Sequence, residues 1–196
     1  HARAAGSGGC LYRVGPDSRI ENVLTFAPHS AEPERRASQG PIVTSEGSIV
    51  VPTLGPSASA FLRLHEYRPS TGIWEESFGT EAAGLTNISS SDRRPGVTPG
   101  PSGVLWIVES SATPELFGLR VLRHSTTSRT VEVAGVLHQT MVDWQGANER
   151  LAHATDGRWY GTAPAGDSAE SAGCIYRVHP TEPGLEVVVR FPANGS

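Results

Sequence analysis

The chain has few of the residues that mark disulfide-stapled, nucleic-acid-binding or membrane proteins. Its 196 residues include two cysteines and one methionine, and charged residues make up 18% with a formal net charge of −4. No apolar run approaches the roughly 20 residues that a membrane-spanning helix needs, and no long run of positive charge is present. We therefore expect neither a membrane span nor a nucleic-acid partner.

The two cysteines are too few to imply a disulfide framework. They lie in matching contexts, Gly-Gly-Cys-Leu-Tyr-Arg-Val at Cys10 and Ala-Gly-Cys-Ile-Tyr-Arg-Val at Cys174. Equivalent positions of two repeated units should lie beyond the roughly 7 Å between Cα atoms that a bridge allows. We predict two free, partly buried thiols, with a disulfide as the alternative.

Turn-forming residues are plentiful, with 22 Gly and 15 Pro, and they recur with a period. Successive turns are spaced about 53, 57 and 54 residues apart, and a period of this size is typical of propeller or solenoid arrays. Three sets of anchors keep this spacing: Pro16, Pro69, Thr126 and Pro180; Gly47, Gly103 and Gly157; Phe26, Phe78, Val136 and Phe191.

In a complete repeat we predict four short strands, a to d. Runs rich in β-branched and aromatic residues alternate as half-buried strands do, and Gly, Pro, Ser and Thr fill the gaps between them. The last unit, 149–192, shows them most clearly, with Asp156-Gly157 as the turn between a and b. The other predicted strands are 42–44, 48–53, 61–67 and 73–78; a strand near 97–98, then 104–109, 119–124 and 130–136; and 10–14 and 21–26. Pro52 weakens its strand, because proline cannot donate to a ladder.

We predict an all-β fold of the β-propeller type, with about three and a half four-stranded blades. One domain, 1–196, would hold units at about 1–27, 40–79, 95–137 and 149–192. A β-sandwich is the alternative. The first unit has only strands c and d, which leaves an open strand edge. Three arrangements could resolve this. The chain could be part of a larger ring, which we favour, or a second copy or another chain could supply the missing strands. Alternatively, the half-blade could close a compact ring of about four units.

The b–c and d–a connections of a blade emerge on one face, and here they are long. Long loops in a compact domain are often functional, so we expect binding on this face, with plain solvated loops as the alternative. The predicted loops are 55–60, 110–118 and 163–173 between b and c, and 28–39, 79–95 and 138–148 between d and a.

The last unit contains Asp156-Gly157, Tyr160-Gly-Thr162, a small-residue loop, Gly173-Cys-Ile-Tyr-Arg-Val and a closing Val189-Arg-Phe. This order resembles one copy of the bacterial tandem repeat called GloVer, and Gly8-Gly-Cys-Leu-Tyr-Arg-Val with Leu24-Thr-Phe resembles its second half. The likeness covers about a third of the chain. The second and third units lack Tyr-Gly-Thr. The resemblance implies an extracellular or surface-associated repeat protein and brings no catalytic residues.

No nucleophile elbow, zinc spacing or phosphate loop occurs, so we predict no catalytic residues, no metal and no cofactor. The candidate binding residues are Asp92, Arg93, Arg94, Asp143, Trp144 and His153. Trp144 beside a carboxylate could form a platform for a carbohydrate, or it could pack between blades. His153, on strand a of the last unit, could be a ligand or base, or could simply cap the strand.

Arg13, Arg123 and Arg177 recur at one position of strand c, where the second unit has Glu66. A ring of arginines could bind an anion, but we favour a solvated strand face.

The leading functional hypothesis is a non-catalytic, secreted or surface-associated binding or structural module. One alternative is a hydrolase or lyase with a metal or acid–base site at the channel mouth. Another is a subunit of a larger assembly, with a protein partner or a second copy at the incomplete first blade.

Overall fold

The computed structural model describes residues 10–25, 36–37, 40–54, 62–79, 95–113, 116–138, 150–163 and 171–192. These ranges contain fifteen strands in four antiparallel sheets. Within them no helix is long and apolar enough to cross a membrane.

The first sheet is a two-stranded half sheet, and each of the other three sheets begins a new unit of the repeat. The half sheet holds β1 (Cys10–Val14) and β2 (Ile20–Thr25). The second sheet holds β3 (Arg36–Ala37), β4 (Ile42–Val43), β5 (Ile49–Leu54), β6 (Leu62–Arg68) and β7 (Ile73–Gly79). The third holds β8 (Gly96–Pro99), β9 (Val104–Thr113), β10 (Leu116–Ser125) and β11 (Thr130–His138). The fourth holds β12 (Ala152–His153), β13 (Trp159–Ala163), β14 (Ser171–Val178) and β15 (Leu185–Pro192).

A β-bulge recurs at one place in all four sheets. The pairing between the last two strands of each sheet shifts register just before Tyr12, His65, Leu122 and Tyr176. These positions lie 53, 57 and 54 residues apart, which matches the spacing of the predicted turns. Since a bulge bends a strand and increases its twist, each sheet receives the same local distortion at the same point.

The turn glycines of the repeat lie where they were predicted. Gly47, Gly103 and Gly157 each lie in the turn between the first two main strands of a separate sheet, with φ of 80°, 68° and 79°. Positive φ costs glycine little because it has no Cβ. The three glycines therefore set the same tight hairpin three times, as the repeat requires.

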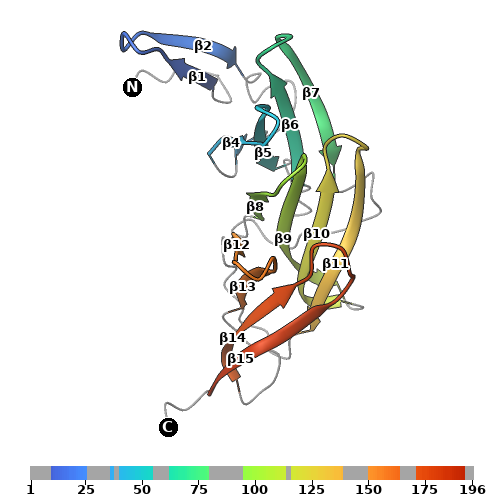
Figure 1. The fold of residues 1–196 in the computed structure, drawn as a ribbon. Coiled ribbons are helices and arrows are strands. Elements are labelled where there is room, and N and C mark those ends of the chain that lie inside the picture. The colour runs from blue at the N-terminus through green and yellow to red at the C-terminus, as the bar shows by residue number, and fades with distance from the viewer. Residues whose placement is uncertain are drawn as a thin grey trace.

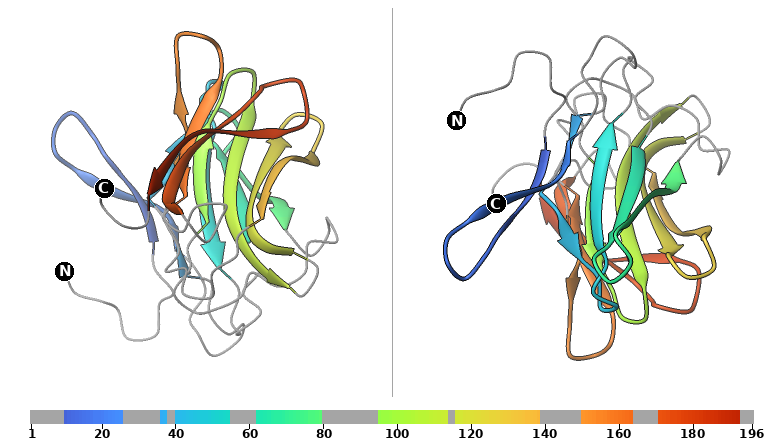
Figure 2. Two further views of the ribbon diagram at one scale, coloured as in Figure 1. Left: turned by 90° about the horizontal axis from the view of Figure 1, so that it is seen from below. Right: turned by 90° about the horizontal axis from the view of Figure 1, so that it is seen from above.

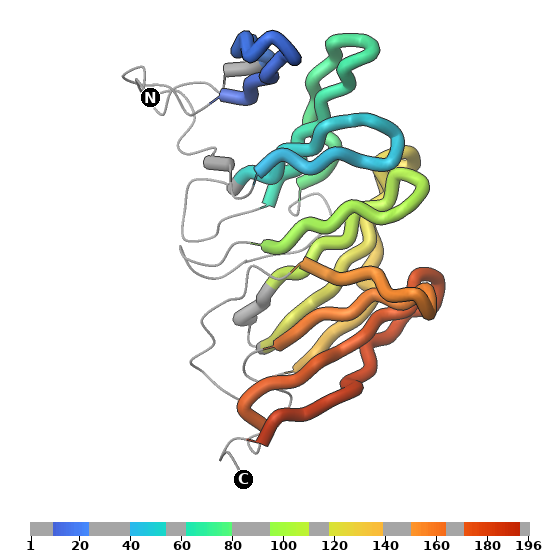
Figure 3. Tube along the Cα trace, turned by 60° about the vertical axis from the view of Figure 1, so that its left-hand side comes forward, coloured from blue at the N-terminus to red at the C-terminus, as the bar shows by residue number. Residues whose placement is uncertain are grey.

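The sheets follow one another along an open arc, from the half sheet at one end to the fourth sheet at the other (Figures 1 and 3). Viewed along the arc, the β1–β2 hairpin projects to one side of the stacked sheets (Figure 2). The first strands β4 and β8 of neighbouring sheets are in contact, and so are the last strands β11 and β15.

Three apolar clusters fill the spaces between successive sheets. Alternation along β9 shows how one strand serves two of them: Leu105 and Ile107 pack toward the second sheet, while Trp106 and Val108 pack toward the fourth. The third sheet is therefore buried on both faces. Side chains of a strand alternate between the two faces of its sheet, so a period of two can supply both interfaces.

Several of the predicted loops are partly strand. Most of the predicted loop 110–118 belongs to β9 and β10, whose ladder pairs Thr113 with Leu116. The predicted loop 28–39 contains β3, which shares one edge of β5 with β4. The pairing of β5 with these two strands is interrupted opposite Val51 and Pro52. Pro52 lacks an N–H, which is consistent with the interruption. Strands also take the ends of three other predicted loops, at Gly79, at His138, and at Ala163 with 171–173. Apart from Pro95, the rest of the predicted loop residues lie outside the described residues.

The two cysteines, both within the described strands, form no disulfide, as predicted. Cys174 is buried in the fourth sheet, but Cys10 is exposed on the half sheet. The expectation that both are partly buried was wrong, because the two equivalent strands differ in what covers them.

Candidate functional site

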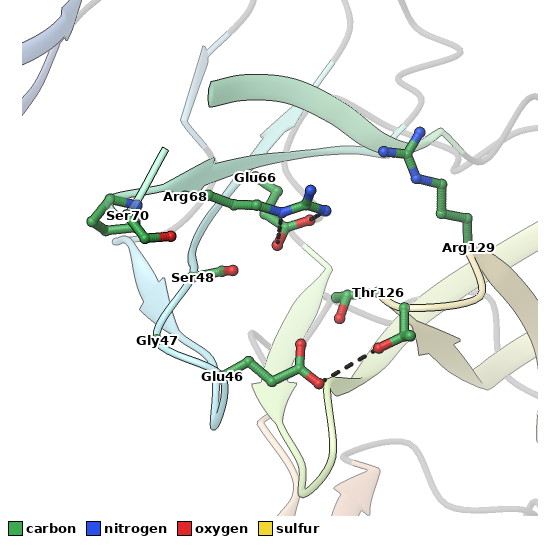
Figure 4. A pocket seen from close by; sticks show the side chains of 10 residues that line it. Glu46, Gly47, Ser48, Glu66, Arg68, Ser70, Thr126 and Arg129 are labelled. Atoms are coloured by element: carbon green, nitrogen blue, oxygen red, sulfur yellow. Dashed lines mark hydrogen bonds and ion pairs between the residues drawn. The ribbon is translucent and has the colours of Figure 1, made fainter. Parts of the chain in front are cut away.

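A polar cavity of about 730 Å³ lies between the second and third sheets, at the end where the short turns emerge (Figure 4). The second sheet contributes the turn before β5, the end of β6 and the turn after it, and the third sheet contributes the turn between β10 and β11. The lining residues are Glu46, Gly47, Ser48, Glu66, Arg68, Pro69, Ser70, Thr126, Thr127 and Arg129. This is the face opposite to the long loops, where binding was predicted.

The charged residues at this cavity differ from those at the equivalent positions of the other three sheets. Three sheets have an arginine on strand c that forms an ion pair with the glutamate directly across on strand d: Arg13 with Glu21, Arg123 with Glu132, and Arg177 with Glu186. In the second sheet, Glu66 faces Glu75 instead. Like charges directly opposite one another destabilise a sheet, so this pair needs cations from elsewhere.

Arg68 supplies the first of those cations from the same strand. Its Nε and one Nη lie 3.2 Å from the two carboxylate oxygens of Glu66, and an Nη lies 3.0 Å from Oε1 of Glu75. The Glu66 side chain is almost completely buried, whereas that of Arg68 is partly exposed. A two-point contact between guanidinium and carboxylate fixes the orientation of both groups.

Arg129 supplies the second cation from the neighbouring sheet, with an Nη 2.6 Å from Oε2 of Glu75. Burial raises the pKa of the Glu66 carboxyl. The hydrogen bonds from Arg68 and Ser48 and the charges of Arg68 and Arg129 outweigh burial and hold that pKa below its ordinary value. Glu66 is therefore an ionised, fully engaged acceptor on a buried part of its strand. The solvated face that we favoured for this strand position holds for Arg13, Arg123 and Arg177, which are exposed or partly exposed, but not for Glu66.

The mouth of the cavity holds Glu46, whose carboxylate forms no ion pair within 4 Å in the described part of the chain, although it interacts through its charge with Arg68. Its Oε1 lies 3.5 Å from the hydroxyl oxygen of Thr127 (Figure 4). A Cβ at Gly103 would lie 2.6 Å from Oε1 of Glu46 and 2.7 Å from Oγ1 of Thr126, so the glycine makes room for both. The Gly103 N–H also donates to Oγ of Ser45 at 3.3 Å, which ties the turns of the two sheets together.

Of the predicted binding residues, only His153 lies within the described residues. It is exposed on β12, and its ring packs on Trp159, the residue across from it on β13, with ring centroids 4.6 Å apart. Asp92, Arg93, Arg94, Asp143 and Trp144 lie outside the described residues. The cavity residues were missed, although the departure of Glu66 from the repeated arginine was visible in the sequence.

The arginines on strand c do not form an anion-binding ring, because each is paired with the glutamate of its own sheet. Asp156, at the turn of the fourth sheet, accepts hydrogen bonds from the Arg158 N–H at 3.1 Å and the Tyr160 hydroxyl at 2.8 Å. These bonds lower the pKa of Asp156 and hold its carboxylate within its own turn. The described ranges contain no group of three His, Cys, Asp or Glu residues that could hold a metal.

Comparisons with known proteins bear on the fold. No family model and no curated protein matches the chain. TolB from Acinetobacter baumannii, a β-propeller protein, is similar with a TM-score of 0.50 at 14% identity, over 92% of this chain and 37% of that one. An α-L-arabinanase from Penicillium chrysogenum, solved with arabinobiose, gives 0.48 at 12% identity, over 78% of this chain and 49% of that one. An α-L-arabinofuranosidase from Fusarium graminearum, solved with an iminosugar inhibitor, gives 0.47 at 11% identity, over 78% and 48%.

The likeness to TolB, together with the four-stranded antiparallel sheets, confirms the predicted β-propeller fold and excludes the sandwich. At 14% identity it shows the fold alone. The chain spans 37% of the TolB chain and about half of each glycosidase.

Proposed function

We propose that this chain is a non-catalytic β-propeller segment that binds a ligand carrying a positively charged group in the cavity between its second and third sheets. The observation that carries the proposal is the charge of that cavity. Three carboxylates, Glu46, Glu66 and Glu75, lie in or beside it with two guanidinium groups, those of Arg68 and Arg129. The excess is one negative charge, and Glu46 at the mouth is the carboxylate that forms no direct ion pair among the described residues.

The remaining polar groups favour binding over catalysis. Both oxygens of Glu66 are engaged by Arg68, and its lowered pKa keeps it ionised, so it is not a proton donor near neutral pH. Hydroxyl groups of Ser48, Ser70 and Thr126 can orient a ligand by hydrogen bonds. The described lining has no aromatic side chain on which a sugar could stack, so a carbohydrate ligand, if there is one, belongs to the long-loop face.

The proposed setting is secreted or surface-associated. It is supported by the resemblance of the last unit to the GloVer-type repeat. Labelling of intact cells with a membrane-impermeant reagent tests it: a surface protein is labelled, and one that is labelled only after lysis contradicts this part of the proposal.

The ligand is tested by nuclear magnetic resonance titration with three matched probes. N-acetyl-lysine amide carries the cation, N-acetyl-glutamine amide is neutral, and N-acetyl-glutamate amide carries the opposite charge. We expect the lysine probe to shift the amide resonances of Gly47, Gly103 and Thr127 at lower concentration than the other two. Glu46→Gln should weaken this binding by up to about fivefold, the equivalent of about 1 kcal/mol for a partly exposed ion pair.

The control for this titration is Glu182→Gln, which neutralises an exposed carboxylate on the turn between β14 and β15. It should leave the affinity for the lysine probe unchanged. Equal binding of all three probes, stronger binding of the acidic probe, or equal effects of the two substitutions would each contradict the proposed cation site.

A further inference from the structure

The strand β1 is a near copy of β14 in a different setting. Its sequence, Cys10-Leu-Tyr-Arg-Val14, matches Cys174-Ile-Tyr-Arg-Val178 with one conservative change. The strand β14 lies between β13 and β15, whereas β1 pairs with β2 alone among the described strands. No described strand pairs with the other edge of β1, and a strand edge without a partner is a template for another strand.

The same side chains are buried in one copy and exposed in the other. Tyr176 and Val178 are 0% and 1% exposed because they pack toward the third sheet, while Tyr12 and Val14 are 58% and 57% exposed. The alternate face of β1 is covered, since Leu11 packs with Val51 on the second sheet. The exposed face of β1 thus carries the same residues that are buried in a complete blade, and no described strand covers that face or the adjacent edge of β1.

The fourth sheet indicates what kind of strand fits beside this sequence. Tyr176 lies directly across from Gly161 on β13, and a Cβ at Gly161 would be 2.3 Å from the tyrosine Cζ. At the corresponding position of the third sheet, Leu122 lies across from Ile107. In the second sheet, His65 lies across from Val51. The glycine is therefore matched to the wide tyrosine, and a glycine opposite Tyr12 would let its ring lie as that of Tyr176 does.

An open space that side chains of an added strand could enter lies beside β1. A cavity of about 310 Å³ lies between the half sheet and the second sheet, and its lining includes Leu11, Tyr12, Val43, Ile49 and Tyr67. Val43 on β4 is exposed and large. In the neighbouring sheets the first strands β4 and β8 are in contact, so an added first strand would lie next to β4 and cover Val43.

We propose that the free edge of β1 binds a β-hairpin of the kind formed by residues 150–163, supplied by a polypeptide segment outside these 196 residues. The second strand of the hairpin carries a glycine opposite Tyr12 and a large apolar residue opposite Val14. This is the register in which Gly161 and Trp159 of β13 pair with β14. Backbone hydrogen bonds hold the added strand, and the glycine sets the register.

The test uses the full chain and a fluorescently labelled synthetic peptide with the sequence of residues 150–163. Fluorescence anisotropy should show saturable binding, and hydrogen exchange should show new protection at the amides of β1. A peptide with valine in place of the glycine equivalent to Gly161 should bind at least about tenfold more weakly, because the valine meets Tyr12. A scrambled peptide of the same composition is the control. The discriminating change is in the peptide, so folding of the protein is not at risk.

A cycle with Tyr12→Ala completes the test. In this variant the glycine and valine peptides should bind within about twofold of each other, because the ring that discriminates between them is absent. No binding of the glycine peptide, or equal binding of both peptides to the natural chain, overturns the proposal. So does a concentration-dependent dimer in light scattering whose formation protects β1, because a second copy would then be the occupant.

Discussion

Substitution of Gly161 by alanine tests the packing argument on which the repeat depends. The added Cβ would lie 2.3 Å from Cζ and Oη of Tyr176 and 2.8 Å from its Cε2, far inside van der Waals contact. The tyrosine ring is completely buried in the cluster between the third and fourth sheets, with Trp106 and Trp159 among its members, so it cannot retreat without displacing them. Overpacking of this kind costs about 1–3 kcal/mol.

The expected change is measurable by urea or thermal denaturation followed through tryptophan fluorescence. For a chain of this size, about 1–3 kcal/mol corresponds to a fall in Tm of about 2–12 °C. Gly40→Ala is the matched control, because a Cβ at Gly40 would meet nothing within 4 Å, and its effect should stay within about 0.5 kcal/mol.

A double-mutant cycle isolates the contact between the two residues. Tyr176→Ala alone should cost about 3–5 kcal/mol, as truncation of a buried aromatic side chain does. In the double variant the methyl group introduced by Gly161→Ala enters the vacated space, so the total cost should be smaller than the sum of the single costs by about 1–3 kcal/mol. A cost of Gly161→Ala below about 0.5 kcal/mol, or strictly additive effects, would refute the reasoning.

Two further predictions concern buried charges of the third sheet. Glu109 is completely buried and lies across from Arg120, its ion-pair partner. Arg120→Met removes that partner and should cost about 3–5 kcal/mol in urea denaturation, and the double variant with Glu109→Leu should recover most of that loss. A single cost no larger than that of Arg13→Met, about 0–1 kcal/mol for an exposed pair, would contradict this. Burial lowers the pKa of His124 below its ordinary 6.5, so the stability that its neutral form contributes is complete above pH 6.5 and is lost as the pH falls below it. The free energy of unfolding should therefore decrease from pH 7 to pH 5, with a slope that His124→Gln reduces.

Local features of the sequence were enough to predict the blades. The turn glycines Gly47, Gly103 and Gly157 need a left-handed backbone, and the strands between them alternate with a period of two. Both are properties of short segments, so they can be read without knowing the neighbours. Their regular spacing then predicted equivalent sheets, which the recurring bulge before Tyr12, His65, Leu122 and Tyr176 matches.

Strand lengths near the loops were less predictable. The segment Ser110 to Thr113 consists of small and polar residues without apolar alternation, so it was interpreted as a loop. In the structure it continues β9, because β10 pairs with it as far as Leu116. Backbone pairing extends this hairpin, and backbone pairing leaves no signature in the sequence of side chains.

The candidate site was visible in the sequence as a departure from the repeat, but its meaning was not. Glu66 stands where Arg13, Arg123 and Arg177 stand in the other units, and the sequence determined that the second unit differs there. Only the tertiary structure decided that Glu66 is buried and that Arg129 reaches Glu75 from the neighbouring sheet. The side of a strand on which a residue lies follows from its position in the chain, whereas what covers that side depends on a sheet more than fifty residues away.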